Sequence, residues 1–160
     1  MNVKRVLFVC TGNSCRSVMA KYLMQDLLKK AGIDQVRVDS AGVFAHEGMP
    51  STRETQQVLK EVGVDCSGHF ARVVTPEMVK NSEVVLVMEQ FHLEEVLRRM
   101  PSAKGKVHLL KAYGRDLHEP QLQQDIADPI GKPLEVYEVC CAQIRDEVER
   151  VAKLMGVHRP

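Results

Sequence analysis

The chain has 160 residues, of which 44% are hydrophobic and 27% charged, a balance typical of a globular protein with one sizeable core. Its formal net charge of +1, with lysine and arginine scattered along the sequence, gives no reason to expect nucleic acid or an anionic membrane as a partner. No apolar run approaches the length of a membrane span and no signal peptide precedes the first strand, so we expect a cytoplasmic protein whose residues 1–160 form a single domain.

The first predicted element is a strand from Arg5 to Cys10, which leads directly into a short polar loop. The loop ends at Arg16, so a cysteine and an arginine stand at its two ends. A loop of this length can curl until its backbone N–H groups point inward and the guanidinium closes the ring around an anion. These groups bind phosphate oxygens and also favour the thiolate of Cys10 beneath the phosphorus. The loop is therefore predicted to be both an anion site and a nucleophile.

A helix is predicted to begin at Ser17, because Met19, Leu23 and Leu27 recur at four-residue intervals on one face. Strand, loop and helix then form a unit that holds an anion at a helix N-terminus. The same cysteine-to-arginine spacing occurs again from Cys66 to Arg72. That second segment follows a polar turn and precedes no helix, so we assign the anion site to the first segment.

Strand-like and helix-like patterns alternate along the rest of the chain, without a linker or an internal repeat. Further strands are predicted at Val36–Ala41, Glu83–Met88 and Lys106–Lys111, and helices at Thr52–Val62, after Thr75-Pro76, at Gln90–Arg99 and at about Leu134–Met155. This alternation predicts an α/β fold, a three-layer sandwich in which a central four-stranded parallel sheet has helices on both faces. The phosphate loop follows the first strand, at the carboxyl edge where such sheets bind anions.

A second chemical group is Asp128, which precedes Pro129. A phosphate ester that leaves as an alkoxide needs a proton, and a carboxylic acid facing Cys10 could supply it. The proline restrains Asp128 to an extended conformation, which fixes the direction of its carboxyl group. An isolated Asp-Pro pair is more typical of a turn, and Asp116 and Asp125 are alternative acids.

Taken together, these motifs resemble the low-molecular-weight protein tyrosine phosphatase family. The resemblance rests on the run from Val9 to Ser17 and on four segments in the family's order, namely Ser40-Ala41-Gly42, His69-Phe70-Ala71-Arg72, Val85-Leu86-Val87-Met88 and Asp128-Pro129. It implies a cysteine-dependent phosphatase of one domain, without metal or cofactor. The residues themselves agree, since no cysteine or histidine cluster has zinc-ligand spacing and an odd number of cysteines argues against a disulfide framework.

The resemblance also implies a role for each matched residue. Cys10 attacks phosphorus to form a phosphocysteine, and Arg16 with the loop residues stabilises the equatorial oxygens. Asp128 protonates the leaving group and then serves as general base for the attacking water. The substrate-binding loop residues are Thr11, Gly12, Asn13, Ser14, Cys15 and Ser17.

Two supporting roles follow from matched positions, in which Ser17 donates to the Cys10 thiolate and His69 helps Asn13 to hold the loop. Serine is also a routine helix N-cap, and a histidine is more often an ordinary core or surface residue. Cys15 is either an interior residue or the partner of Cys10 in a reversible protective disulfide. The remaining cysteines are interpreted as packing residues: Cys66, Cys140 and Cys141.

The resemblance implies a phosphorylated protein as substrate, with inorganic phosphate or another oxyanion as product or inhibitor. Family members that act on phosphotyrosine usually carry aromatic residues after the Asp-Pro pair and in the segment after the second strand. Here Ile130 follows the pair, Phe44 stands on the other wall, and Ser14 puts a hydroxyl at a loop position. The family's arginine phosphatases place a threonine at that loop position. We therefore expect Ser14, Ile130 and Phe44 to set specificity, with phosphotyrosine and phosphoarginine both open and arginine favoured.

Two other classes share parts of the motif. Thioredoxin-coupled arsenate reductases relay oxidation through two cysteines after the third strand, but the segment from Met88 to Pro101 contains none. Phosphocysteine carriers lack the loop arginine and the acid, whereas Arg16 and Asp128 are both present. Both alternatives are disfavoured.

Overall fold

The computed structural model describes residues 5–116 and 124–157. The strands are β1 (Arg5–Cys10), β2 (Arg37–Gly42), β3 (Val84–Val87) and β4 (Val107–Leu109). The helices are α1 (Arg16–Lys30), α2 (Arg53–Glu61), α3 (Pro76–Lys80), α4 (Gln90–Arg99) and α5 (Leu134–Leu154), with a 3₁₀ turn at Pro101–Ala103. Within the two described ranges, no helix combines the length and the apolar character needed to cross a membrane.

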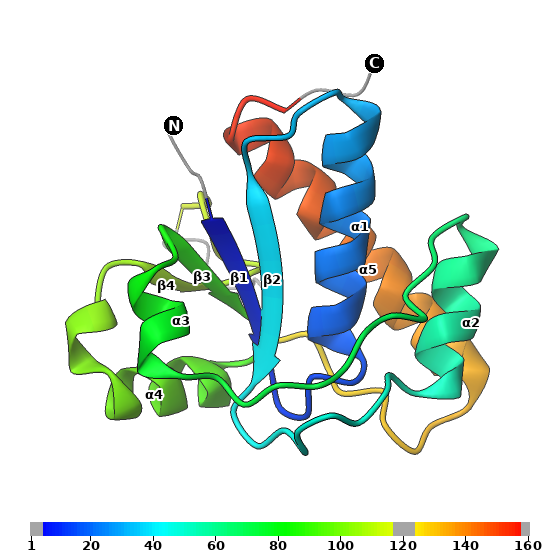
Figure 1. The fold of residues 1–160 in the computed structure, drawn as a ribbon, viewed down its shortest axis with the longest axis horizontal. Coiled ribbons are helices and arrows are strands. Elements are labelled where there is room, and N and C mark those ends of the chain that lie inside the picture. The colour runs from blue at the N-terminus through cyan, green and yellow to red at the C-terminus, as the bar shows by residue number, and fades with distance from the viewer. Residues whose placement is uncertain (1–4, 117–123, 158–160) are drawn as a thin grey trace.

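The four strands form one parallel sheet in the order β2-β1-β3-β4. Successive β1 residues face opposite sides of this sheet, since Val6 and Phe8 belong to one apolar cluster and Leu7 and Val9 to another. Helices α1, α2 and α5 cover the first cluster and α3 and α4 cover the second, as the two sides of Figure 1 show. The predicted α/β three-layer sandwich is confirmed.

For most helices and strands, the predicted and observed ends differ by no more than one residue. Helix α4 has the predicted ends, and α3 begins as expected because the Thr75 hydroxyl accepts from the Met78 N–H at 3.2 Å, with Pro76 in the first helical position. Strand β4 is shorter than the prediction of Lys106–Lys111, since the chain turns after Leu109, whose carbonyl accepts from the Ala112 and Tyr113 N–H groups. The 3₁₀ turn is a feature that the sequence pattern did not predict.

The sheet brings distant residues to one edge. Cys10 lies beside Gly42 in the register of β1 and β2, and β3 on the other flank of β1 ends just before Met88 and Glu89. In Figure 1 the arrows of β1 and β2 point downward and the loop that follows β1 lies below their tips. The chemistry predicted from sequence therefore lies at the carboxyl edge of the sheet.

Candidate active site

The loop after β1 is held by Asn13, a fully buried residue in the left-handed region with φ of 53°. Asparagine tolerates this conformation better than most residues, and it lets the loop turn back on itself. Its Oδ1 accepts from the Arg72 backbone N–H at 3.0 Å, which fixes the orientation of the amide. The Nδ2 group then donates to the hydroxyls of Ser17, at 2.8 Å, and Ser40, at 2.9 Å.

This orientation also fixes the direction of the hydrogen bond to Cys10. The Ser17 hydroxyl accepts from Asn13, so its own proton is available to Cys10 Sγ, which lies 2.9 Å away. A hydroxyl donor at this distance stabilises a thiolate. Ser17 is the second residue of α1, whose N-cap is Cys15, so the alternative reading of Ser17 as a helix cap is wrong.

Arg16 is 1% exposed, and its charge is surrounded by acceptors. Nη1 donates to the Ile126 carbonyl at 2.7 Å and lies 2.9 Å from Glu89 Oε2. Nη2 lies 3.5 Å from Asp128 Oδ2. Burial alone would lower the pKa of Arg16, but the negative groups of Cys10, Glu89 and Asp128 outweigh it, and the pKa is raised. The guanidinium is therefore a permanent buried cation beside Cys10.

Asp128 has a partly exposed carboxyl group at the edge of the same site. Its Oδ1 accepts from the Ile130 N–H at 3.1 Å, so the turn that contains Pro129 orients the carboxyl. The alternative acid Asp125 is used differently, because its Oδ1 accepts from the Gln90 N–H at 2.9 Å at the start of α4. That contact anchors the segment before Asp128 on α4, so of Asp125 and Asp128 it is Asp128 whose carboxyl contacts Arg16.

These groups line one pocket of about 350 Å³. Three segments line the pocket: the phosphate loop, the segment after β2 and the turn that contains Asp128. The lining residues are Cys10, Thr11, Gly12, Ser14, Cys15, Arg16, His46, Met49, Pro50, Thr52, Asp128 and Ile130. The predicted nucleophile, cation and acid are thus brought together.

The second cysteine-to-arginine segment, Cys66–Arg72, braces the first. His69 Nε2 lies 2.8 Å from the Asn13 carbonyl and donates to it, and the Arg72 N–H donates to the Asn13 side chain. Burial lowers the pKa of His69, so the neutral imidazole makes this hydrogen bond. Gly42 completes the brace, because a Cβ there would lie 2.5 Å from the Thr11 carbonyl oxygen. Only glycine lets β2 approach the loop this closely.

The cysteines fall into different environments, and all five are free. Cys15 Sγ lies in the pocket wall at 3.6 Å from the Thr52 hydroxyl and 3.9 Å from the Tyr137 hydroxyl. Burial raises the pKa of Cys140 to about 12 and that of Cys141 to about 11, and it also raises the pKa of Cys66. Buried thiols of this kind pack rather than react.

Two residues that the sequence reasoning missed hold the site from the β3 side. Glu89 pairs with Arg16, and His92 Nε2 lies 2.8 Å from the Thr11 hydroxyl. Both residues lie just after β3, which is adjacent to β1. Polar residues that follow neighbouring parallel strands gather at the carboxyl edge of the sheet, so this position is the signal that could have placed them near Cys10. Met49 and Pro50 were also missed as lining residues, since their loop has no periodic pattern.

Phe44, expected as a specificity residue, is absent from the described residues that line the pocket. Its ring is 54% exposed and stacks on Phe91 at a centroid distance of 5.9 Å, and the Arg99 guanidinium lies 5.3 Å from it. Ser14 and Ile130 do line the pocket. The ring on the wall after β2 is the imidazole of His46.

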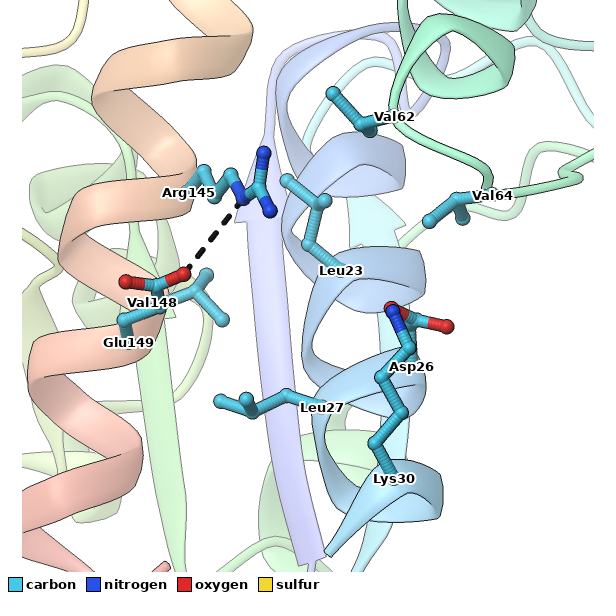
Figure 2. Close-up of a pocket in the computed structure, with 9 residues that line it drawn as sticks. All are labelled: Leu23, Asp26, Leu27, Lys30, Val62, Val64, Arg145, Val148 and Glu149. Atoms are coloured by element: carbon cyan, nitrogen blue, oxygen red, sulfur yellow. Dashed lines mark ion pairs between the residues drawn. The ribbon is translucent and has the colours of Figure 1, made fainter. Parts of the chain in front are cut away.

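Figure 2 shows a separate cavity of about 240 Å³ between α1, α5 and the turn after α2. Leu23, Leu27 and Val148 form its apolar sides, and an Arg145–Glu149 ion pair of 3.6 Å runs along α5 beside it. None of its lining residues belongs to the phosphate loop or to the Asp128 turn. It is a packing feature between helices and is distinct from the site of the predicted chemistry.

Comparison with known proteins agrees with the family resemblance seen in the sequence. The family model described as low molecular weight phosphotyrosine protein phosphatase matches residues 5–158. A protein-arginine-phosphatase of Geobacillus stearothermophilus is 37% identical over 93% of this chain and 94% of its own length. A solved low molecular weight protein tyrosine phosphatase from T. tengcongensis is 36% identical, with a TM-score of 0.85 over 94% of this chain and 98% of that one. The tyrosine phosphatase Wzb from Escherichia coli in complex with sulphate is 27% identical, with a TM-score of 0.84 over 96% and 99%.

Proposed function

The chain belongs to the low molecular weight phosphotyrosine protein phosphatase family, whose members are cysteine-dependent phosphatases, and from this premise we propose that Cys10 is its nucleophile, Arg16 its phosphate-binding cation and Asp128 its general acid. The observation that carries the proposal is that these three side chains line one pocket. The match over residues 5–158 supports treating the whole chain as a single phosphatase domain.

In the first step Cys10 Sγ attacks phosphorus in line with the leaving group. Arg16 and the loop N–H groups bind the equatorial oxygens, where negative charge increases in the transition state. Asp128 transfers its proton to the leaving atom as the bond to phosphorus breaks, which leaves a phosphocysteine and an ionised Asp128.

In the second step water attacks the phosphocysteine and Asp128 takes a proton from it. Inorganic phosphate forms and Cys10 leaves as a thiolate, which the Ser17 hydroxyl stabilises from 2.9 Å. Asn13 and His69 keep the loop in the conformation that these steps need. Cys15 lines the same pocket, where its thiol could also protect oxidised Cys10 by forming a disulfide. A thiolate nucleophile stays reduced most readily in a reducing compartment, which supports a cytoplasmic location.

The substrate is proposed to be a phosphorylated protein, with phosphoarginine favoured over phosphotyrosine. No phenylalanine, tyrosine or tryptophan is among the described lining residues, so a phenyl ring would lack an aromatic stacking partner. Ser14 offers a hydroxyl that can accept from a guanidinium, and Ile130 gives an apolar wall. A relative 37% identical is named a protein-arginine-phosphatase, which points the same way.

The test is kcat/KM on two peptides that share one sequence, one with phosphoarginine and the other with phosphotyrosine, with the Cys10→Ser protein as blank. We expect faster hydrolysis of phosphoarginine. The Ser14→Ile variant should shift the ratio of the two rates towards phosphotyrosine, since it removes the acceptor for the guanidinium. Faster tyrosine hydrolysis by the unaltered protein would end the arginine proposal and leave the phosphatase mechanism intact.

A further inference from the structure

His92 is fully buried in the first turn of α4, and both of its ring nitrogens have partners. Nδ1 lies 3.0 Å from the backbone nitrogen of Glu89, whose N–H can only donate. Nδ1 must therefore be the unprotonated nitrogen, and Nε2 carries the ring proton. Burial, together with the positive charge of Arg16, lowers the pKa of His92 to about 3, so this neutral tautomer persists at neutral pH.

The proton on Nε2 decides how the Thr11 hydroxyl is used. Nε2 lies 2.8 Å from Thr11 Oγ1 and donates to it, and Arg16 Nη2 donates to the same oxygen from 3.4 Å. A hydroxyl oxygen has two lone pairs, and both are then occupied. Within residues 5–116 and 124–157, these two donors are the hydrogen-bond partners of Thr11 Oγ1. The remaining capacity of the hydroxyl is to donate its own proton.

We propose that His92 is a positioning residue which makes the Thr11 hydroxyl an obligatory donor to a phosphoryl oxygen in the pocket. The inference rests on the proposed function, because the acceptor is the phosphate that Cys10 attacks. Thr11 lines the pocket with Cys10 and Arg16, so an anion bound there lies beside this residue and can accept the proton that its hydroxyl donates. A donor whose direction is fixed in advance needs no reorganisation when charge develops on the phosphoryl group.

The same arrangement limits what Thr11 can recognise. A guanidinium group offers donors alone, and Thr11 has no lone pair left to accept from it. Thr11 should therefore contact the phosphoryl group common to phosphoarginine and phosphotyrosine. Its contribution should be equal for the two substrates, whereas Ser14 should change their ratio.

The experiment compares Thr11→Val, Thr11→Ser, His92→Leu, His92→Gln and the double variant Thr11→Val/His92→Leu. The readouts are kcat/KM on both peptides and the dissociation constant of inorganic phosphate by calorimetry. We expect Thr11→Val to lower kcat/KM about 10-fold on both substrates and to weaken phosphate binding by a similar factor, as for loss of a hydrogen bond to a charged group. Thr11→Ser should restore most of the loss, because it retains the hydroxyl.

His92→Leu should lower activity in the native background but by less than about 2-fold when Thr11 is already valine, since His92 acts through that hydroxyl. His92→Gln, which keeps an N–H donor, should retain more activity than His92→Leu. The matched control is His108→Leu, whose imidazole contacts the Tyr113 ring instead, and it should behave as the unaltered protein.

Unchanged kinetics and phosphate affinity in Thr11→Val would overturn the proposal, as would effects of Thr11→Val and His92→Leu that multiply in the double variant. If the His92 variants fail to fold, the valine and serine variants at Thr11 still decide whether the hydroxyl donates. Phosphate binding separates this inference from the proposed function. Loss of affinity in Thr11→Val would support the donor even if Cys10→Ser left hydrolysis unaffected.

Discussion

Two segments of this chain have a cysteine and an arginine with the same spacing, and the fold uses them in different ways. Cys10–Arg16 follows a central strand and begins a helix, so its loop lies at the carboxyl edge of the sheet. Cys66–Arg72 follows a turn after α2 and does not lead directly into a helix, and its cysteine packs in the core while its arginine forms a partly exposed ion pair of 3.3 Å with Asp39. The second segment braces the first through His69 and the Arg72 N–H. Position relative to the sheet, more than spacing, is therefore the basis on which we propose the first segment as the reactive one.

The largest expected effect comes from replacing each of the two cysteines with serine in separate variants. Cys10→Ser should lower kcat roughly 10⁴-fold or more, because serine at neutral pH is a far weaker nucleophile than a thiolate. Cys66→Ser should leave kcat within about 2-fold and lower the free energy of unfolding by at most about 1 kcal/mol, since the new hydroxyl lies among apolar core residues but has the Ser51 hydroxyl, 3.5 Å from Cys66 Sγ, as a neighbour. Turnover and urea denaturation of both proteins test this, and equal loss of activity would contradict the comparison.

Substitution of the two arginines should have effects on kcat/KM that differ almost as strongly as those of the two cysteines on kcat. Arg16→Lys should lower kcat/KM about 10³-fold, because an ammonium cannot bind two oxygens in the planar geometry of a guanidinium. Arg72→Lys should have little effect, since its brace uses the backbone N–H and its side-chain ion pair is 42% exposed. Steady-state kinetics on one phosphopeptide measures both, and a large loss in Arg72→Lys would show that its side chain has a direct role.

Asn13 connects the two segments through its side chain, so its replacement should moderately lower both kcat and the free energy of unfolding. Asn13→Ala removes the amide that links Ser17, Ser40 and Arg72. It also puts alanine, which tolerates the left-handed region less well than asparagine, at this position. We expect kcat to fall about 10- to 100-fold and unfolding free energy to fall by about 2 kcal/mol. Asn13→Gly is the informative partner, because it relieves the backbone strain without restoring the hydrogen bonds. Equal kinetics for the two variants would assign the effect to the amide.

The smallest effect is a pH dependence of stability that originates in the bracing segment. The pKa of His69 is lowered in the folded protein by burial, so the unfolded chain binds more protons as pH falls below about 6.5. His69 should therefore lower the free energy of unfolding with falling pH in this range by at most about 1.4 kcal/mol per pH unit, in addition to the decrease from buried His92, whose pKa is lowered to about 3. Urea titrations at pH 7.5, 6.5 and 5.5 measure the slope, and His69→Gln should flatten it. An unchanged slope in His69→Gln would mean that other groups set it.

Local patterns predicted most strand and helix positions and the Cys10–Arg16 loop, whereas the choice of Asp128 also needed the family resemblance. Cys10, Arg16 and Asp128 each stand in a short motif whose backbone context is visible in the sequence, and the structure places them around one pocket. Glu89 and His92 were not predicted, because their roles depend on β3 lying beside β1. The packing of Phe44 against Phe91 on α4 could not be foreseen for the same reason. Contacts between segments distant in sequence need the sheet order.

The central claim is that Cys10, and not Cys66, carries the phosphoryl group during turnover. The most direct measurement is to mix the Asp128→Ala protein with an aryl phosphate, quench during the first turnover and locate the phosphoryl group by peptide mass spectrometry. Tryptic cleavage separates the two cysteines, on peptides 6–16 and 61–72. We predict phosphorylation of Cys10 in the first peptide and none in the second. A phosphoryl group on Cys66, or an unmodified Cys10 under conditions of turnover, would contradict the account.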